Sequence, residues 1–146
     1  MAFPANIELS DLNGSSGFKL SGAAEFDVSS FAVAAAGDVN GDGFDDVIVG
    51  AYGADTARGA SYVVFGKASG FVANIELSSL NGSTGFKLSG VAVDDLSGNS
   101  VSTAGDVNGD GFADLIVGAW RADTSGYDSG ASYVVFGKAS GFDANV

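Results

Sequence analysis

Short apolar runs, separated by turns rich in Gly, Asn, Asp and Ser, predict a chain built of β-strands. The run 46–50 is continuously apolar after its first residue, which is typical of a strand buried on both faces. The run 60–65 carries Tyr, two Val and Phe, which favour the pleated surface of a sheet. The expected strands are about 31–38, 46–50, 60–65 and 85–89 in one half of the chain, and 99–106, 114–118 and 131–136 in the other.

The chain consists largely of one unit written twice. Three stretches recur, the first two with two changes each and the third unchanged: 5–22 as 73–90, 36–51 as 104–119, and 59–71 as 130–142. The period is 68 residues, or 71 where residues 125–129 lengthen a loop by three. Repetition of a strand unit at this spacing predicts a repeat architecture rather than two unrelated domains.

Four strands in each period of about 70 residues, joined as an up-and-down meander, predict a β-propeller blade. We therefore expect an all-β chain with two four-stranded antiparallel blades. The expected division is an N-terminal segment 1–22 that carries an outer strand, a first blade 23–90, and a second blade 91–146 without an outer strand of its own. Near-identity of the repeats fits a recent duplication, and equally a fragment that was designed or excised from a longer propeller.

Composition narrows the class of function. The 146 residues hold 46% hydrophobic residues and a formal charge of −12, which argues against nucleic acid and anionic lipid as partners. No apolar run approaches the roughly 18 residues of a membrane helix, and the start of the chain predicts no signal peptide. The chain has no Cys and no His, so it has no disulfide, thiolate site or histidine base. We expect no enzymatic activity.

One acidic stretch in each repeat points to a cation. In 38–46 and again in 106–114, oxygen side chains stand at positions 1, 3, 5 and 9 and Gly at positions 4 and 6. Calcium takes six to eight oxygen ligands on a loop that can curl around it. The predicted ligands of two Ca²⁺ ions are Asp38, Asn40, Asp42, the Phe44 carbonyl and Asp46, and Asp106, Asn108, Asp110, the Phe112 carbonyl and Asp114.

The acidic stretch has two other interpretations. An EF-hand requires a bidentate Glu at position twelve, where this chain has Val49 and Val117. An ordinary acidic turn between two strands explains a single copy, because Asp, Asn and Gly are common turn residues. Two copies, each followed by a distal Asp and an apolar run, favour the calcium loop.

The run 104–119, Ala-Gly-Asp-Val-Asn-Gly-Asp-Gly-Phe-Ala-Asp-Leu-Ile-Val-Gly-Ala, resembles the FG-GAP repeat of integrin α-subunit propellers and of many bacterial surface proteins. The resemblance implies an extracellular or cell-surface role and a calcium loop between the first and second strands of each blade. Two departures stand out: Ser29-Ser30 and Ser97-Gly98 replace the Phe-Gly pair, and Tyr52 and Trp120 replace the Pro of Gly-Ala-Pro.

The phase of the strands suggests self-assembly. A spare outer strand at 17–21 precedes the first blade, and no outer strand follows 131–136. Because two blades cannot close a ring and an open edge invites pairing, we expect chains to join head to tail by strand exchange. A homotrimer gives a six-bladed propeller and a homotetramer an eight-bladed one.

The sequence supports a calcium-stabilised scaffold or adhesion module, with a lectin-type or peptide-binding propeller as the alternative. The alternative relies on loop residues that differ between the repeats, which are Phe26, Phe31, Tyr52, Arg58, Asp94, Asn99, Trp120, Arg121 and Tyr127. No external ligand is indicated.

Overall fold

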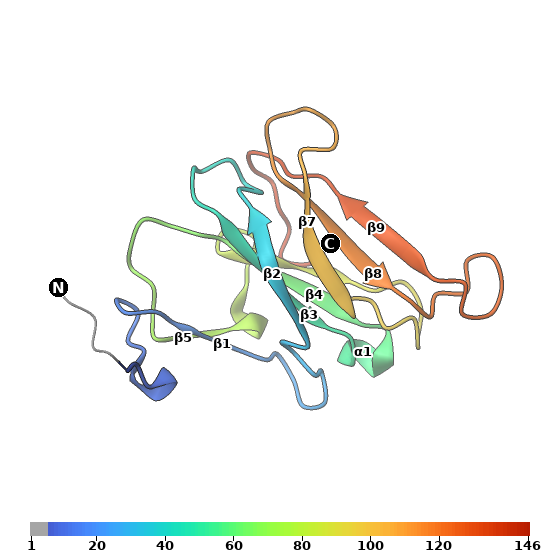
Figure 1. Cartoon of the computed structure of the whole chain (residues 1–146), viewed down its shortest axis with the longest axis horizontal. Helices are drawn as coiled ribbons and strands as arrows, with labels where there is room; N and C mark the ends of the chain where they lie inside the picture. The colour runs from blue at the N-terminus through green and yellow to red at the C-terminus, as the bar shows by residue number, and fades with distance from the viewer. Residues whose placement is uncertain (1–5) are drawn as a thin grey trace.

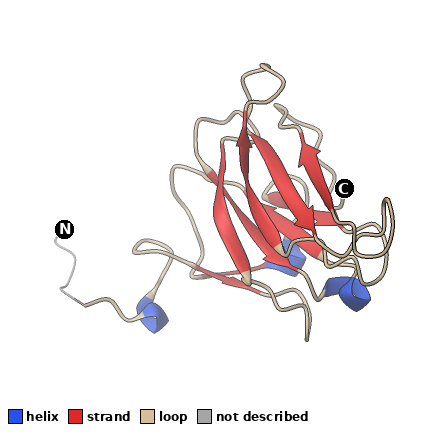
Figure 2. Cartoon of the chain, turned by 45° about the vertical axis from the view of Figure 1, so that its right-hand side comes forward, coloured by secondary structure: helices blue, strands red, loops and turns tan. Residues whose placement is uncertain are grey.

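The computed structural model describes residues 6–146, in which nearly all regular structure is β-strand (Figure 2). The strands are β1 (Lys19–Ser21), β2 (Ala32–Gly37), β3 (Asp46–Ala51), β4 (Ala60–Val64), β5 (Asn74–Glu76), β6 (Gly85–Ser89), β7 (Ser100–Gly105), β8 (Asp114–Ala119) and β9 (Ala131–Val135). The helical pieces are single turns: α1 (Ala54–Ala57) and two 3-10 turns, Leu9–Asp11 and Leu77–Ser79. The all-β class and the predicted strands are confirmed, with strand ends that differ by one or two residues.

The first half of the chain forms a four-stranded antiparallel sheet in the order β2-β3-β4-β6. Its two central strands are almost entirely buried, since Ile48 and Val63 are paired partners with no exposed surface. The outer strand β6 is fixed by a turn in which the Asn81 carboxamide oxygen accepts hydrogen bonds from the backbone N–H groups of Ser83 and Thr84. Such a side-chain turn is the behaviour that an Asn-Gly sequence favours.

The second half repeats this sheet with three strands, in the order β7-β8-β9. Its register is that of the first sheet, because Val101 opposes Val117 as Val33 opposes Val49. Within residues 6–146, β9 pairs only with β8. The second sheet therefore lacks a counterpart of β6 in the described part of the chain.

A short parallel pair, β1 with β5, was not predicted from the sequence. It joins the segment before the first sheet to the segment that leads into β6. The same arrangement recurs at the C-terminus, where Asn145 forms a parallel bridge with Lys87 of β6. Each outer strand of the sequence is thus bordered by a segment that comes from the following repeat.

The two sheets pack face to face, with β2 beside β7 (Figure 1). Ile48 and Val63 of the first sheet meet Leu115 and Val117 of the second in one buried cluster. Phe86 of β6 is fully buried in it, and the ring of Phe142 stacks on Phe86 with centroids 4.6 Å apart. One core cluster therefore lies at the junction between the repeats, and a second lies within the first repeat, where Val49, Tyr62 and Leu77 are buried together.

We predict that Phe86→Ala lowers the free energy of unfolding by about 3–5 kcal/mol, because it leaves a cavity at a site with no exposed surface. Phe26→Ala is the matched control, since that ring is 82% exposed; its effect should stay within about 0.5 kcal/mol. Chemical denaturation measures both. Equal losses in the two variants would contradict this position of the core.

Candidate metal centre

Two acidic loops connect the first and second strands of each sheet. The first acidic loop (38–46) links β2 to β3 and the second acidic loop (106–114) links β7 to β8, at the same end of the two sheets (Figure 1). Gly41 and Gly43 have φ values of +73° and +87°, and Gly109 and Gly111 have +75° and +91°. Gly adopts these left-handed conformations without steric cost, which explains why both loops have Gly at these positions.

The carboxylate at position 1 organises each loop from within. Asp38 accepts hydrogen bonds from the backbone N–H of Asp42 at 3.0 Å and of Gly43 at 2.9 Å. In the second loop Asp106 accepts the same pair, from Asp110 at 3.0 Å and Gly111 at 2.9 Å. The chain around each loop is therefore curled about the side chain of its first residue.

Positions 3 and 5 repeat this chemistry further along the loop. Asn40 accepts from the backbone N–H of Asp42, and Asp42 accepts from that of Phe44. The carboxamide of Asn40 also donates to Asp42 at 3.0 Å. All three contacts recur in the second loop, between the residues Asn108, Asp110 and Phe112.

The carboxylate at position 9 is buried and bridges three segments. Asp46 has 1% of its surface exposed, and it accepts from the backbone N–H of Val39 at 2.9 Å and of Gly66 at 2.8 Å. Asp114 is fully buried and accepts from Val107 at 2.7 Å and Gly137 at 2.9 Å. Sequence reasoning did not predict this bridging role. The signal that could have revealed it is a charged residue at the start of a buried strand in both copies.

Burial raises the pKa of Asp46 to about 6, because water no longer solvates the charged form. The hydrogen bonds from Gly66 and Val39 act in the opposite direction, and the negative charges of Asp42 and Asp38 raise the pKa further. The first acidic loop thus holds like charges that repel one another. A divalent cation among them would reverse this electrostatic penalty.

The two loops touch each other across the junction. The backbone N–H of Ala113 donates to the Asp38 carbonyl, and that of Lys138 donates to the Val39 carbonyl, each at 3.0 Å. The Phe112 ring covers Gly41 so closely that no side chain fits at that position. The first loop is therefore supported by the second repeat.

The donor set fits calcium in chemical type. Each loop presents three carboxylates, one carboxamide and a backbone carbonyl, and each carboxylate offers about four lone-pair positions, of which the loop N–H groups use only part. Among residues 6–146, however, no three carboxylates converge closely enough to hold an ion by themselves. The amide and carbonyl oxygens would therefore have to contribute to the shell.

The variable loops lie at the opposite end of the sheets, where β3 leads to β4 and β8 leads to β9. The ring of Phe31 packs edge-on against Tyr52, with centroids 4.9 Å apart. In the second repeat the Arg121 guanidinium lies 5.8 Å from the Trp120 ring and pairs with Asp128. Tyr127 is 82% exposed. These residues form an aromatic rim remote from the acidic loops.

Tandem antiparallel sheets packed face to face, each with an acidic loop between its first two strands, define the class of β-propeller repeat proteins. The family model of the FG-GAP repeat matches residues 31–64 and 97–135, together half of the chain. The chain belongs to the FG-GAP repeat family.

Its relatives include integrin α subunits. The chain is 41% identical over 96 residues to integrin alpha pat-2 of Caenorhabditis elegans, covering 62% of this chain and 7% of that protein. It is 36% identical over 108 residues to integrin alpha-V of Gallus gallus and 34% identical over 109 residues to integrin alpha-5 of Xenopus laevis, each time covering 73% of this chain and 10% of the relative. The chain thus spans a tenth or less of the length of these proteins. Over the described residues, no helix has the length and apolar character to cross a membrane.

We predict that, in chelator, the folded chain gains stability on the order of 1 kcal/mol between pH 7 and pH 5 through Asp46. Its pKa of about 6 lies above the ordinary 3.8, so the folded state takes up this proton before the unfolded state does. The ionised form is a cost above pH 6, and that cost is relieved as the pH falls. Denaturation curves of Asp46→Asn should lack this gain, whatever their absolute stability. If Asp46→Asn keeps the wild-type dependence of unfolding free energy on pH, other carboxylates cause that dependence.

Proposed function

We propose that the chain is a non-enzymatic calcium-binding β-propeller module that serves in adhesion or as a scaffold and assembles with copies of itself. One observation carries the proposal: two separate loops present the same oxygen ligands and hold them through the same set of backbone hydrogen bonds. A loop that served only as a turn would not need three carboxylates in both copies.

Calcium would act by removing the repulsion within each loop. In the first loop, Asp38 and Asp42 disfavour the charge of the buried Asp46. An ion bound among these side chains favours the charged form and ties the start of β3 to the end of β2. The folded state then binds the ion while the unfolded state does not, so calcium stabilises the fold by mass action.

The remaining buried acids support a structural rather than a catalytic interpretation. Asp95 is buried and accepts a hydrogen bond from the backbone N–H of Ala92, three residues earlier, as a turn residue does. Asp27 is buried at the corresponding place in the first repeat. Because the chain also has no His or Cys, these carboxylates have no cysteine nucleophile or histidine base to act with.

We place the chain outside the cell or at its surface, on the strength of its similarity to integrin α subunits. Extracellular calcium modules work with dissociation constants near 10⁻⁴–10⁻³ M, which are useless at cytosolic calcium levels. We expect dissociation constants of this order for the two acidic loops.

A ligand-binding role is the second candidate, and the aromatic rim favours it. Trp120 is 54% and Tyr127 is 82% exposed, and both belong to the loop that is longer in the second repeat. Exposed aromatic rings can stack on sugars or anchor a peptide. Glycan-array binding that is lost in Trp120→Ala would support a sugar-binding role, and an array without signal would remove that role.

We predict two calcium ions per chain, counted by native mass spectrometry and titration calorimetry. At a calcium concentration 100 times the dissociation constant, each site should add about 2.7 kcal/mol to the free energy of unfolding. Asp42→Ala and Asp110→Ala should each remove one ion, because each deletes a position-5 ligand. Asp45→Ala is the matched control, since the corresponding residue of the second loop is Ala113. An unchanged melting temperature with calcium would refute the proposal.

A further inference from the structure

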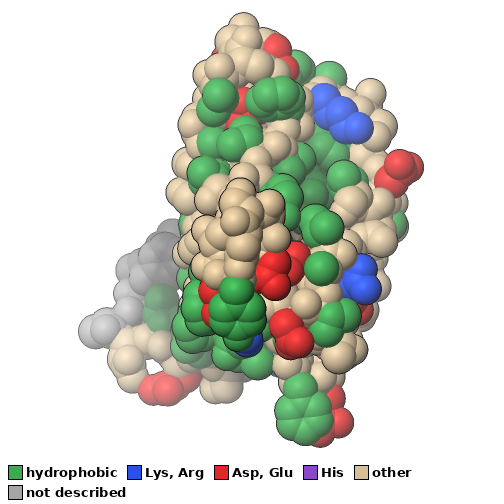
Figure 3. All heavy atoms as spheres, turned by 90° about the vertical axis from the view of Figure 1, so that its right-hand side faces the viewer, with side chains coloured by type: hydrophobic (Ala, Val, Ile, Leu, Met, Phe, Trp, Pro, Cys, Tyr) green, Lys and Arg blue, Asp and Glu red, His purple; other side chains and the backbone are tan. Residues whose placement is uncertain are grey.

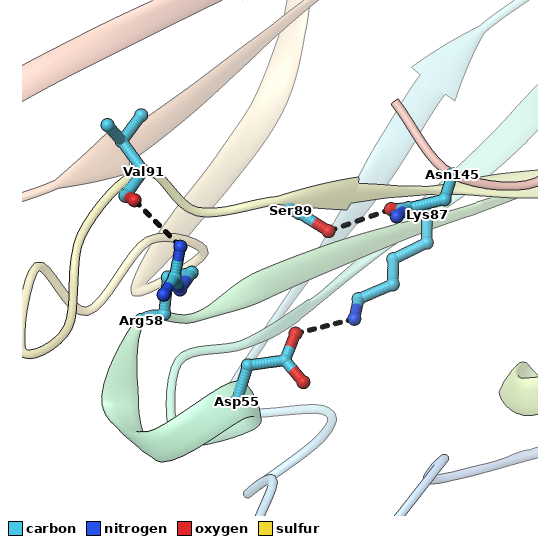
Figure 4. Close-up of polar contacts among 6 residues, drawn as sticks. All are labelled: Asp55, Arg58, Lys87, Ser89, Val91 and Asn145. Atoms are coloured by element: carbon cyan, nitrogen blue, oxygen red, sulfur yellow. Dashed lines mark hydrogen bonds and ion pairs between the residues drawn. The ribbon is translucent and has the colours of Figure 1, made fainter.

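The outer strand of the first sheet shows what a complete edge looks like. On one side β6 pairs antiparallel with β4, so that Phe86 opposes Val63 and Leu88 opposes Ser61. On the other side it borders the C-terminal segment, where the Lys87 N–H donates to the Ala144 carbonyl at 2.9 Å. Figure 4 shows this second border, with the Ser89 hydroxyl 2.7 Å from the Asn145 carboxamide oxygen. A strand of sequence Gly-Phe-Lys-Leu-Ser is thus held on both edges.

In the described part of the chain, the identical sequence 17–21 is held on one edge only. The Lys19 N–H donates to the Ala73 carbonyl at 2.9 Å, and the Ser21 hydroxyl lies 2.7 Å from the Asn74 carboxamide oxygen. These contacts reproduce those of Lys87 and Ser89. Within residues 6–146, however, β1 pairs only with β5. The edge that corresponds to the β4 side of β6 has no strand beside it in this part of the chain.

The strand β9 lacks the outer strand that its counterpart β4 has, within the described residues. Residues 130–142 repeat 59–71 without a change, yet their burial differs. Val63 is fully buried and Phe65 is 8% exposed, whereas the corresponding Val134 and Phe136 are 46% and 54% exposed. Figure 3 views the side of the molecule on which β9 lies and shows hydrophobic side chains at its surface. The same side chains are a core in one copy and a surface in the other.

An aromatic cluster shows the same missing part. In the first repeat three rings meet, since Phe65 lies 5.8 Å from Phe86 and 5.4 Å from Phe142, and Phe86 stacks on Phe142. At the N-terminal end Phe18 stacks on Phe71 at 4.5 Å, with the same interplanar angle of 10° as the Phe86–Phe142 pair. Phe18 and Phe71 are the counterparts of Phe86 and Phe142, and the counterpart of Phe65 in the second repeat is Phe136. A third ring beside Phe18 and Phe71 would therefore be a Phe136.

We propose that β1 of a second copy of this chain pairs antiparallel with β9, in the register of β6 on β4. Phe18 of the second copy then opposes Val134, and Leu20 opposes Ser132. Phe136 becomes the third ring beside Phe18 and Phe71 of that copy. This inference rests on the proposed self-assembling propeller and names the contact through which it assembles.

The faces behind these strands are complementary in the same way. Val33 and Val47 of the first sheet are 65% and 36% exposed, while their counterparts Val101 and Leu115 pack in the junction between the sheets. On the part of this face that β1 and β5 leave uncovered, the first sheet therefore exposes the counterparts of residues that the second sheet packs in the junction. The proposed contact brings the Val33 and Val47 face of one copy against the Val134 face of the other. This arrangement repeats the junction between the two sheets of one chain.

The second acidic loop gains a neighbour in this arrangement. Phe112 covers Gly41, but no atom lies within 4 Å of the position where a side chain at Gly109 would begin. Phe44, which corresponds to Phe112, is 41% exposed. Phe44 of the second copy would cover Gly109, so that the second loop is supported as the first one is.

Charge is also compatible. Lys87 of β6 pairs with Asp55 of α1 at 2.6 Å (Figure 4). Lys19 is the counterpart of Lys87, and Asp123 is the counterpart of Asp55. Across the proposed contact these two residues come from different copies and carry opposite charges. The contact is head to tail, so three copies close a six-bladed ring and four an eight-bladed ring.

The first test is native mass spectrometry at micromolar concentration with calcium. We expect a mass three or four times the 14.4 kDa of one chain. Val134→Asp should reduce it to one chain, because it places a charge in the new core. Val72→Asp is the matched control: Val72 is 60% exposed, and its counterpart in the second repeat is Asp143. An assembly unaffected by Val134→Asp, or a wild-type monomer, overturns the proposal.

The second test identifies the occupant and does not depend on the folding of a charged variant. The chain has no Cys, so Leu20→Cys and Ser132→Cys each introduce a single thiol. Opposed residues of neighbouring strands lie within disulfide range. Mixed and oxidised, the two variants should form a heterodimer on a non-reducing gel. Failure to cross-link, or equal cross-linking of either variant alone, overturns the proposal. Ser61→Cys/Leu88→Cys, which joins an observed pair within one chain, is the positive control.

The calcium sites and the strand contact fail separately. A chain that binds two calcium ions and remains monomeric retains the calcium module and loses this contact. A ring that forms with or without calcium, and binds none, retains the contact and loses the calcium module.

Discussion

A buried carboxylate that bridges three backbone segments is the interaction on which each repeat depends. Asp46 begins β3, and its two oxygens hold the loop at Val39 and the chain after β4 at Gly66. Without it, the buried N–H of Val39 and the partly buried N–H of Gly66 would lose their acceptor, which costs about 1–3 kcal/mol for a buried group. Burial also makes the charged form of this carboxylate less favourable, because water no longer solvates it, and its pKa is raised. A structural constraint and an electrostatic cost thus meet in one side chain.

The junction between repeats extends this constraint from one loop to the next. The Asp38 and Val39 carbonyls accept hydrogen bonds from the second repeat, at Ala113 and Lys138. The geometry of the first acidic loop therefore depends on the neighbouring sheet as well as on its own sequence. Ligand position and sheet packing are coupled, because moving one sheet moves the carbonyls that border the loop.

Repetition made most of the fold predictable. The strands β3, β4 and β6 were expected within a residue or two, since apolar runs and Asn-Gly turns act locally. The parallel pairing of β1 with β5 was not, because it depends on where the following repeat returns in space. The ligand candidates could be chosen from spacing alone, but the bridging role of Asp46 and Asp114 could not: it requires knowing that Gly66 and Gly137 return to the same place.

The contrast between Val63 and Val134 shows why sequence alone cannot assign burial in a repeat array. Both stand in the same segment, and one is fully buried while the other is 46% exposed. Local propensity is equal, so the difference comes entirely from the presence of a neighbouring repeat and outer strand. In repeat proteins stability is the sum of intrinsic terms and interface terms between neighbours. Here the interface terms decide which of two identical strands belongs to a core. The acidic loops differ in the same sense, because Phe112 covers Gly41 of the first loop, whereas no atom of the described residues lies within 4 Å of the position where a side chain at Gly109 of the second would begin.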